Sequence, residues 1–590
     1  MKNGRIDKTY YAYLLPVVLT VVVLPLAVKL RSYYNPAADY AWNSGAKFAG
    51  DVFLLIKQHI LYMIMGMMAF CLLCFGLLRR KIFRGTKQML LLAGYLLFVV
   101  LSAVLAENTY IAWHGGAERF ESVFVLMGYV LLFYYTYIVI RGEQTHAWQA
   151  RRFLIRAIGV LSFLLGMIGL CQMFGYDIYQ NVWIAKLCGI QNAEYVASDR
   201  IYLSLYHSDY VGVMMTLLLP MNVAGFRMEE KRGGKLFFLV DMLLVVLCLF
   251  ASQSRSGVLC ILICWVLFYP LWISRVKRKK KFILGTVLCL MAGTGLFLVV
   301  NQIQGHSLIQ RFFHTDTTTR QDTIFLETRD DSLVLRLKDT QEYRVTFVGK
   351  GAAMELVVQD AAGQNVAAGT GELSDVTIQK QYISYKGKTV YGYTFSHRKQ
   401  NCFITNQWGD HKYYYLNILG NFDQCILSED AFPVSWYGVA SYRGFVWSKT
   451  IPLLKKTILY GVGPDNFEGY FPNDDYTSRY YSRLGKVIYN KPHSWYLQMA
   501  TETGVVSAVF VILFLAGVIW QGIRVLWRSR TADALAERSM FLAGMFSCVS
   551  YCIMGLLNDS MLVTAPIFWV ILGFTYALLQ EKLEKYPQIG

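Results

Sequence analysis

Residues 236–274 read LFFLVDMLLVVLCLFASQSRSGVLCILICWVLFYPLWIS. Two apolar runs, 236–251 and 257–274, flank the short polar break Ser252–Gly257. Each run is close to the length that a helix needs to cross a hydrocarbon core of about 30 Å. The stretch therefore predicts two membrane-spanning helices joined by a tight polar turn.

Apolar runs of this kind recur along the whole chain of 590 residues, of which 55% are hydrophobic and only 16% charged. A soluble domain carries nearer a quarter charged residues. One run could be a signal sequence, but repeated runs cannot be. The sequence therefore predicts an all-α polytopic membrane protein of about twelve transmembrane helices, near 11–28, 52–78, 88–106, 122–140, 153–175, 209–226, 236–251, 257–274, 282–301, 504–527, 539–557 and 560–580.

The formal charge of +18 raises the question of nucleic-acid binding, and the placement of the charges answers it. With a cytoplasmic N-terminus, the inside connections are strongly basic, as in 79–87 and 275–281. This asymmetry is the positive-inside rule, and it predicts that both termini are cytoplasmic. The basic balance indicates topology and contact with anionic lipids, not nucleic acid. The short outside connections hold only Lys29, Arg31, Lys47, Arg119, Lys186, Arg200 and Arg255.

A long interruption separates the ninth and tenth predicted helices. Within it, short segments of Val, Ile, Thr and Tyr alternate with polar residues and are punctuated by Gly or Asp. This pattern is typical of an antiparallel β-sandwich or small barrel. Its tyrosines and tryptophans could stack on sugars or belong to an ordinary sandwich. The predicted domains are helices one to nine (1–305), an extracytoplasmic β-rich insertion (306–436), an extracytoplasmic helical segment (437–503) and helices ten to twelve (504–590).

Familiar catalytic patterns are missing from the sequence, which has no Gly-rich phosphate loop, metal-ligand spacing or nucleophile elbow. Polar residues instead occupy the predicted outer helix ends. Arg255 in the polar break could bind a lipid phosphate, because guanidinium offers a fork of donors. A snorkelling arginine in a short turn explains it equally well. Arg119 and Arg200 lie in outer loops, where solvated charges are common.

His493 stands near the start of an outward-facing helical segment, after a turn that two glycines and a proline define at Gly461–Pro464. Beside several arginines in an outer vestibule it could act as a general base. A structural histidine is the alternative. Arg443 precedes Trp447 by one helical turn.

Several stretches together resemble the O-antigen ligase and polymerase superfamily of bacterial membrane glycosyltransferases. The resemblance covers most of helices four to twelve and omits 306–436. Two departures stand out: His207-Ser208-Asp209 replaces a common Asn-Pro-Asn, and His493-Ser494-Trp495 replaces His-Asn-Ser. The resemblance rests on Ser254-Arg255-Ser256-Gly257, Gly461-Val462-Gly463-Pro464-Asp465-Asn466-Phe467, His493-Ser494-Trp495-Tyr496-Leu497-Gln498, Arg119-Phe120-Glu121, Arg200 with Tyr210-Val211-Gly212, and Asn558-Asp559-Ser560.

The resemblance implies a GT-C-like fold in the bacterial cytoplasmic membrane and glycosyl transfer on its outer side. The donor would be an undecaprenyl-pyrophosphate-linked oligosaccharide and the acceptor a glycan, lipid or wall polymer, with no cofactor, metal or nucleic acid. His493 and Arg255 would be catalytic, His493 as the base. Substrate contacts, mainly to the pyrophosphate, would come from Arg255, Arg200, Arg119, Arg443 and Asn466.

Three functional alternatives remain open from sequence. A polymerase and a ligase share these motifs, and the β-rich insertion slightly favours a polymerase or another surface-glycan transferase. A transporter or flippase of lipid-linked glycans would need polar residues deep in the spans, which are scarce, Asp241 being the clearest. A non-catalytic surface assembly protein on the same scaffold is the third.

Overall fold

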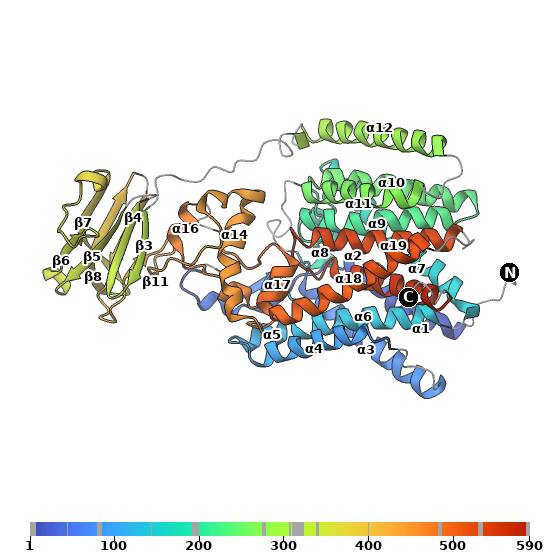
Figure 1. Cartoon of the computed structure of the whole chain (residues 1–590), viewed down its shortest axis with the longest axis horizontal. Coiled ribbons are helices and arrows are strands. Elements are labelled where there is room, and N and C mark those ends of the chain that lie inside the picture. The colour runs from blue at the N-terminus through green and yellow to red at the C-terminus, as the bar shows by residue number, and fades with distance from the viewer. Residues whose placement is uncertain are drawn as a thin grey trace.

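The computed structural model describes residues 8–43, 45–79, 85–142, 144–190, 200–273, 279–305, 308–309, 324–337, 341–398, 400–481, 487–528 and 535–585. A bundle of long helices occupies one end of the molecule, and β-sheets occupy the other (Figure 1). The N and C labels both lie at the end of the bundle far from the sheets (Figure 1).

Within the described residues, every predicted apolar run coincides with helix over most of its length. Among the described residues, seven helices are long and apolar enough to cross a membrane, namely α3, α6, α7, α9, α10, α12 and α18, and the count of about twelve stays a prediction. The first run is broken into α1 (Lys8–Val18), a π-helical turn (Leu19–Val23) and α2 (Leu24–Leu26). The others are α3 (Leu55–Arg79), α4 (Met89–Val104), α6 (Val123–Arg141), α7 (Gln144–Met173), α9 (Ser208–Met228), α10 (Arg232–Ala251), α11 (Arg255–Ile273), α12 (Lys279–Ile303), α18 (Val505–Arg528), α19 (Leu535–Met554) and α20 (Ala565–Lys585).

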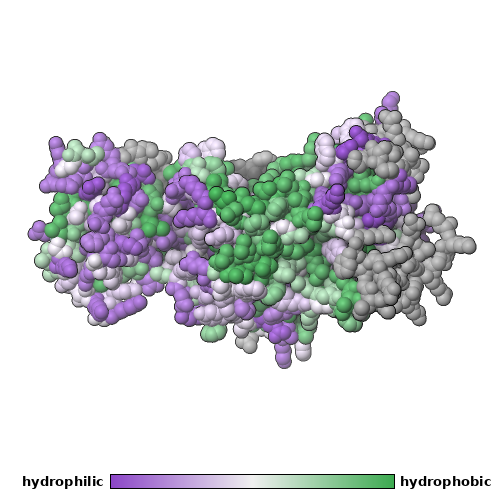
Figure 2. Space-filling view, turned by 60° about the horizontal axis from the view of Figure 1, so that its bottom comes forward, coloured by the Kyte–Doolittle hydropathy of each residue, from purple (hydrophilic) through white to green (hydrophobic). Residues whose placement is uncertain are grey.

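The surface of the bundle matches a protein that sits in a lipid bilayer. Figure 2 shows apolar side chains gathered over the middle of the molecule, with hydrophilic surface on either side of them. Many of the outward-facing residues are large and apolar, such as Leu97 on α4 and Leu262 on α11. Soluble proteins rarely expose contiguous patches of this kind. These helices and this apolar surface support the prediction that the chain is a membrane protein.

Small residues bring the helices of the bundle close together. A Cβ atom added at Gly225 on α9 would lie 2.3 Å from the ring of Phe238 on α10. A Cβ at Gly573 on α20 would lie 2.5 Å from the carbonyl oxygen of Phe133 on α6. Without a hydrophobic driving force between helices in lipid, such close packing is a main source of helix association.

The inserted β-rich module contains two antiparallel sheets. They share one core, to which Leu335 and Val345 contribute from the first sheet and Phe395 and Ile404 from the second. The alternation of apolar and polar residues places one face of each sheet inside. The first sheet has β3 (Ile324–Arg329), β4 (Ser332–Leu337), β5 (Glu342–Val348) and β6 (Glu355–Gln359), and the second β7 (Val376–Tyr385), β8 (Lys388–His397), β9 (Gln400–Thr405), β10 (Tyr414–Leu416) and β11 (Phe422–Gln424).

The module begins and ends at the same place. The backbone nitrogen of Thr328 on its first strand donates to the carbonyl oxygen of Cys425, just after its last strand, at 2.8 Å. The module also contacts the N-terminal part of the chain, because Asn417 and Asn421 both donate side-chain amide hydrogen bonds to Ala41 O. Ala41 lies between β1 (Arg31–Tyr34) and β2 (Phe48–Asp51), a short hairpin that the sequence did not predict.

Candidate functional site

A pocket of about 560 Å³ opens at the end of the bundle that carries the β-module, away from the termini. The starts of α9 and α11 line it, together with the start of α14 (Val439–Leu453) and the loop before α17 (Trp495–Glu502). Four predicted site residues from separate parts of the chain meet here: Arg200, Arg255, Arg443 and His493. His207, Asp209 and Gln253 also line the pocket.

The polar break in the opening stretch forms a compact turn between α10 and α11. Ser252 Oγ donates to Leu249 O at 2.8 Å, and the Gly257 nitrogen donates to Ser254 Oγ at 3.3 Å. A Cβ at Gly212 on α9 would lie only 2.2 Å from Ser254 Oγ, so only glycine allows the turn to pack there. This contact places Arg255 at the first turn of α11, beside the start of α9.

Asp209 connects two of the pocket arginines. Its Oδ1 lies 3.4 Å from Arg200 Nη1, and its Oδ2 lies 3.4 Å from Arg443 Nη2. One carboxylate therefore orients two guanidinium groups at the first turn of α9, whose N-terminus His207 caps by accepting a hydrogen bond from the Asp209 nitrogen. With Arg255, the lining holds three arginines against one acid, so the pocket favours an anion.

His493 enters the pocket from a strained position. Its φ of +53° is uncommon for a residue with a side chain, and such strain gathers at functional sites. Its Nδ1 lies 3.4 Å from Asp559 Oδ2, and its side chain is one-third exposed (33%). With Nδ1 beside Asp559, Nε2 is the ring nitrogen available to a substrate.

Asp559 is the buried partner of His493, in the loop before α20. Burial opposes its ionisation, but His493, helped by Arg119 and Lys491, brings the pKa of Asp559 below its ordinary value. Its other oxygen accepts a hydrogen bond from the Ser494 nitrogen at 3.2 Å. The Trp495 nitrogen donates to the carbonyls of Gly555 and Asn558, so the start of α17 is docked on this loop.

Arg119 lies outside the pocket lining and is completely buried. Its guanidinium donates a bidentate pair of hydrogen bonds to the Glu502 carboxylate, at 2.6 and 3.0 Å. It also lies 2.9 Å from Asp465 and 3.7 Å from Glu121. We name these four residues the Arg119 cluster. Three carboxyl groups surround the arginine, so its place in the structure does not match the pyrophosphate contact that the resemblance implies. It suits a positioning role.

The Arg119 cluster holds several motif stretches against one another. Asp465 Oδ2 accepts hydrogen bonds from the backbone nitrogens of Gly116 and Glu121, at 2.8 and 2.7 Å. Glu121 in turn accepts from Gln498 on α17 and from Ser560. The cluster therefore joins the loop before α6, the turn at Gly461–Pro464 (the Gly-Pro turn) and α17. Because Glu121 contacts both Gln498 and Ser560, it also links the segment that carries His493 to the loop that carries Asp559.

The cluster has one positive charge for three carboxyl groups, and its burial affects their ionisation. Burial raises the pKa of Glu502 to about 7, against the lowering effect of Arg119. Burial also raises the pKa values of Glu121 and Asp465. Deprotonating all three together is unfavourable, and the cluster holds at least one proton more readily than solvated carboxyl groups would.

Asn466 also turns away from the pocket. Its Nδ2 donates to Pro464 O at 3.2 Å, and the side chain is buried. It packs against Gly463, whose φ of +101° requires glycine. Its contacts are those of a residue that shapes the Gly-Pro turn.

Sequence reasoning gave no role to Asp209, Asp559 or Glu502. Asp209 stood in the stretch that departs from the family pattern, and Asp559 stood in the Asn-Asp-Ser motif. An acid at the first turn of a span was the available signal for Asp209. Within the described ranges, His, Cys, Asp and Glu side chains form no group of three or more that could hold a metal ion.

A comparison with protein families matches residues 437–512 to the family described as O-antigen ligase. The resemblance to the O-antigen ligase and polymerase superfamily is confirmed. The O-antigen ligase match runs from Tyr437, just before α14, into α18 and contains Arg443, Asp465, His493 and Glu502. It therefore contains His493, one pocket arginine and half of the Arg119 cluster. No curated protein matches the chain.

Proposed function

We propose that the protein transfers a glycan from a polyprenyl-pyrophosphate donor, of the undecaprenyl type, to a hydroxyl group of a glycan or another surface acceptor. The observation that carries the proposal is the meeting of Arg200, Arg255, Arg443 and His493 in one pocket at a helix end. An O-antigen ligase match that includes two of these residues supports the same class of reaction.

The arginines suit the pyrophosphate of the donor. Guanidinium groups match phosphate oxygens in shape and charge, and they stay charged at any physiological pH. Asp209 holds Arg200 and Arg443 at 3.4 Å each, which orders both side chains before the donor arrives. The donor places its lipid tail in the bilayer, its phosphates at the interface and its sugars in water, and a pocket at the helix ends fits that division.

The proposed step is a single displacement at the anomeric carbon of the donor sugar. The acceptor oxygen attacks this carbon while its proton passes to His493 Nε2, and the bond from the carbon to the pyrophosphate oxygen breaks. The electron pair leaves with the pyrophosphate, whose growing negative charge the arginines stabilise. The buried carboxylate of Asp559 stabilises the imidazolium that forms and keeps the ring oriented.

The pocket is expected to face the outside of the bacterial cytoplasmic membrane. It lies at the opposite end of the bundle from both termini (Figure 1). Because α9 starts at the pocket, its other end, with Arg227 and with Arg232 at the start of α10, lies at the end with the termini. The β-module stands at the pocket end, where a growing chain would emerge. This arrangement favours a polymerase or another surface-glycan transferase over a protein that only binds glycans.

The test is transfer in liposomes that contain the purified protein and a lipid-linked oligosaccharide. Wild-type protein is expected to yield longer chains or a transferred glycan, and Arg255→Ala and His493→Ala are expected to yield neither while folding normally. The exposed Arg329 and His411 in the β-module offer matched controls, and their alanine variants should keep activity. Full activity of both pocket variants would contradict the site, and no product from wild-type protein with any donor would contradict the function.

A further inference from the structure

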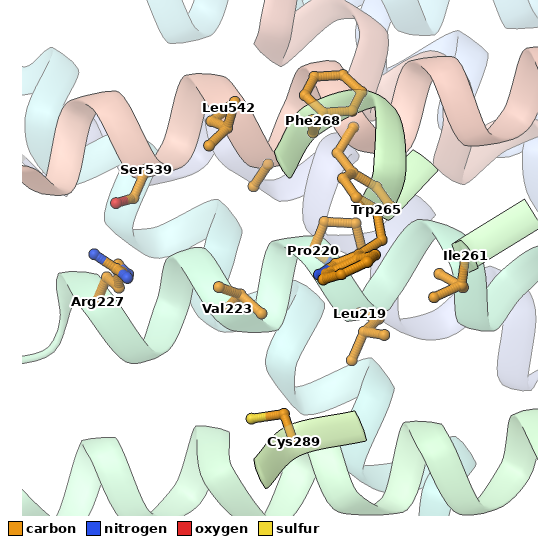
Figure 3. Close-up of a pocket in the computed structure, with 12 residues that line it drawn as sticks. Leu219, Pro220, Val223, Arg227, Ile261, Trp265, Phe268, Cys289, Ser539 and Leu542 are labelled. Carbon is orange, nitrogen blue, oxygen red and sulfur yellow. The ribbon is translucent and has the colours of Figure 1, made fainter. Parts of the chain in front are cut away.

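A second cavity lies within the helix bundle, far along α9 and α11 from the candidate site. It has a volume of about 290 Å³, and its lining is almost wholly apolar. Leu219 and Pro220 on α9 and Trp265 on α11 face Cys289 on α12 across it, and Arg227 stands at one end (Figure 3). α19 closes another side with Leu542 and Phe546.

The cavity lies beside α12, whose contacts with α10 near its C-terminus fix its place. Near its C-terminus, Phe297 packs edge-on against Phe250 of α10, with ring centres 5.4 Å apart. Just beyond the helix, Gln304 Nε2 donates to Ala251 O at 3.0 Å. Figure 1 shows α12 as an outer helix that runs alongside the bundle, and Leu284 and Leu288 in its N-terminal half are exposed. The cavity between Cys289, in the N-terminal half of α12, and the residues of α9, α11 and α19 is called the wedge below.

Water is a poor occupant of this wedge. A cavity lined by Leu, Pro, Trp and Phe side chains offers water almost no hydrogen-bond partners, and apolar cavities stay dry. An empty cavity is unfavourable because its lining loses dispersion contacts. In a bilayer, hydrocarbon chains surround the bundle, so a lipid chain is the natural filling.

Arg227, at one end of the wedge, indicates the charge of the lipid head group that the site would bind. Arg227 is exposed in the last turn of α9, and no ion pair with an acid is found for it within the described residues. The nearby acid Glu229 forms ion pairs with Arg156 at 2.6 Å and with Arg152 at 3.7 Å. Arg232 and Lys279 begin α10 and α12 at the same end. A cationic end on an apolar wedge complements a lipid with a negative head group.

We propose that the wedge binds an acyl chain of an anionic phospholipid from the leaflet at the termini end, with the lipid phosphate on Arg227. The site is separate from the glycosyl-transfer pocket and does not depend on the function proposed for it. The lipid would fill the space that α12 leaves and so complete the packing of that helix.

The test compares phosphatidylglycerol with phosphatidylcholine of identical chains, added to the detergent-purified protein and followed by native mass spectrometry. Wild-type protein is expected to retain phosphatidylglycerol about fivefold more tightly. Arg227→Gln should abolish this preference. Arg528→Gln, at the exposed end of α18 on the same side, is the matched control and should keep it.

Two variants test the apolar part of the site. Val223→Trp fills the wedge from α9, and Cys289→Trp fills it from the exposed surface of α12, where folding is least at risk. Both should reduce retention of both lipids. Unchanged preference in Arg227→Gln, or unchanged retention in a folded tryptophan variant, would overturn the proposal. So would tighter retention of undecaprenyl phosphate than of phosphatidylglycerol that does not depend on Arg227.

Discussion

The carboxylate of Asp559 lies between two parts of the His493 loop: one oxygen is 3.4 Å from the imidazole Nδ1 of His493, and the other accepts the backbone N–H of Ser494. A single buried acid thus holds both the ring and the backbone that carries it. The arrangement is one that many enzymes use to orient a histidine base. In the proposed reaction Asp559 is a positioning residue, since the pocket lining includes His493 and not Asp559.

Replacing Asp559 with asparagine is expected to lower kcat on the order of 10²- to 10⁴-fold, the range that general-base catalysis contributes. KM for the lipid-linked donor should change little, because the arginines remain. Asp559→Glu should recover part of the rate, since it restores the charge. Steady-state transfer assays in liposomes measure both parameters, and a large rise in KM with an unchanged kcat would count against this role.

The pocket arginines are expected to need their guanidinium shape as well as their charge. Arg255→Lys keeps the charge but loses the fork of donors, so kcat/KM for the donor should fall roughly 10- to 100-fold. Asp209→Asn should have a smaller effect of the same kind, because it releases Arg200 and Arg443 without removing them. Transfer rates measured over a range of donor concentrations check this, and full activity of Arg255→Lys would argue against a phosphate contact.

Replacing Arg119 should destabilise the protein. Arg119→Gln leaves three buried carboxyl groups without their cation, and breaking a buried ion pair costs about 3–5 kcal/mol. Arg329→Gln in the β-module removes an exposed ion pair and should cost at most about 1 kcal/mol. Thermal unfolding in detergent compares the two. Equal melting temperatures for wild type and Arg119→Gln would contradict the structural role.

Glu468 is expected to make stability depend on pH. Burial raises the pKa of Glu468, in α15 (Phe467–Tyr470), to about 7, with Glu118 adding repulsion and Asn43 opposing it through a hydrogen bond of 2.8 Å. Its ordinary value is near 4.3. Between these values the folded protein binds the proton more tightly than the unfolded chain, so stability falls as pH rises from about 4.5 to about 7 and then levels off.

Glu468→Gln removes this titration while a side-chain oxygen remains to accept from Asn43. The variant should be more stable than wild type at pH 8, by an amount on the order of 3 kcal/mol, and nearly equal to it at pH 4. Melting temperatures across this pH range are the measurement. The exposed Glu355→Gln serves as a control with no such difference. A constant gap between Glu468→Gln and wild type at all pH values would contradict the assignment.

The helices were predictable because an apolar run of sufficient length has few alternatives in a membrane. The side of the membrane assigned to each arginine rests on the order of the spans and stays a prediction. The convergence of Arg255 with Arg200 and Arg443 was not predictable, because it depends on the packing of Gly212 against Ser254. A glycine in an apolar run gives no sign of the partner it approaches.

Arg119 shows where a motif misleads. An arginine that binds phosphate and one that binds carboxylates look alike in sequence. Its main partner, Glu502, is 383 positions away along the chain, and only the fold brings the two together. The β1–β2 hairpin escaped prediction because each of its strands has only four residues.

The first and last strands of the β-module lie side by side where the module joins the rest of the chain, since Thr328 and Cys425 share a backbone hydrogen bond. A segment whose two ends meet can be lengthened or shortened in its turns while the helices on either side keep their spacing. The turns of the β-module can therefore vary while the pocket residues keep their positions. For the same reason, the turns of this module are the natural place to attach a fluorescent reporter or an affinity handle.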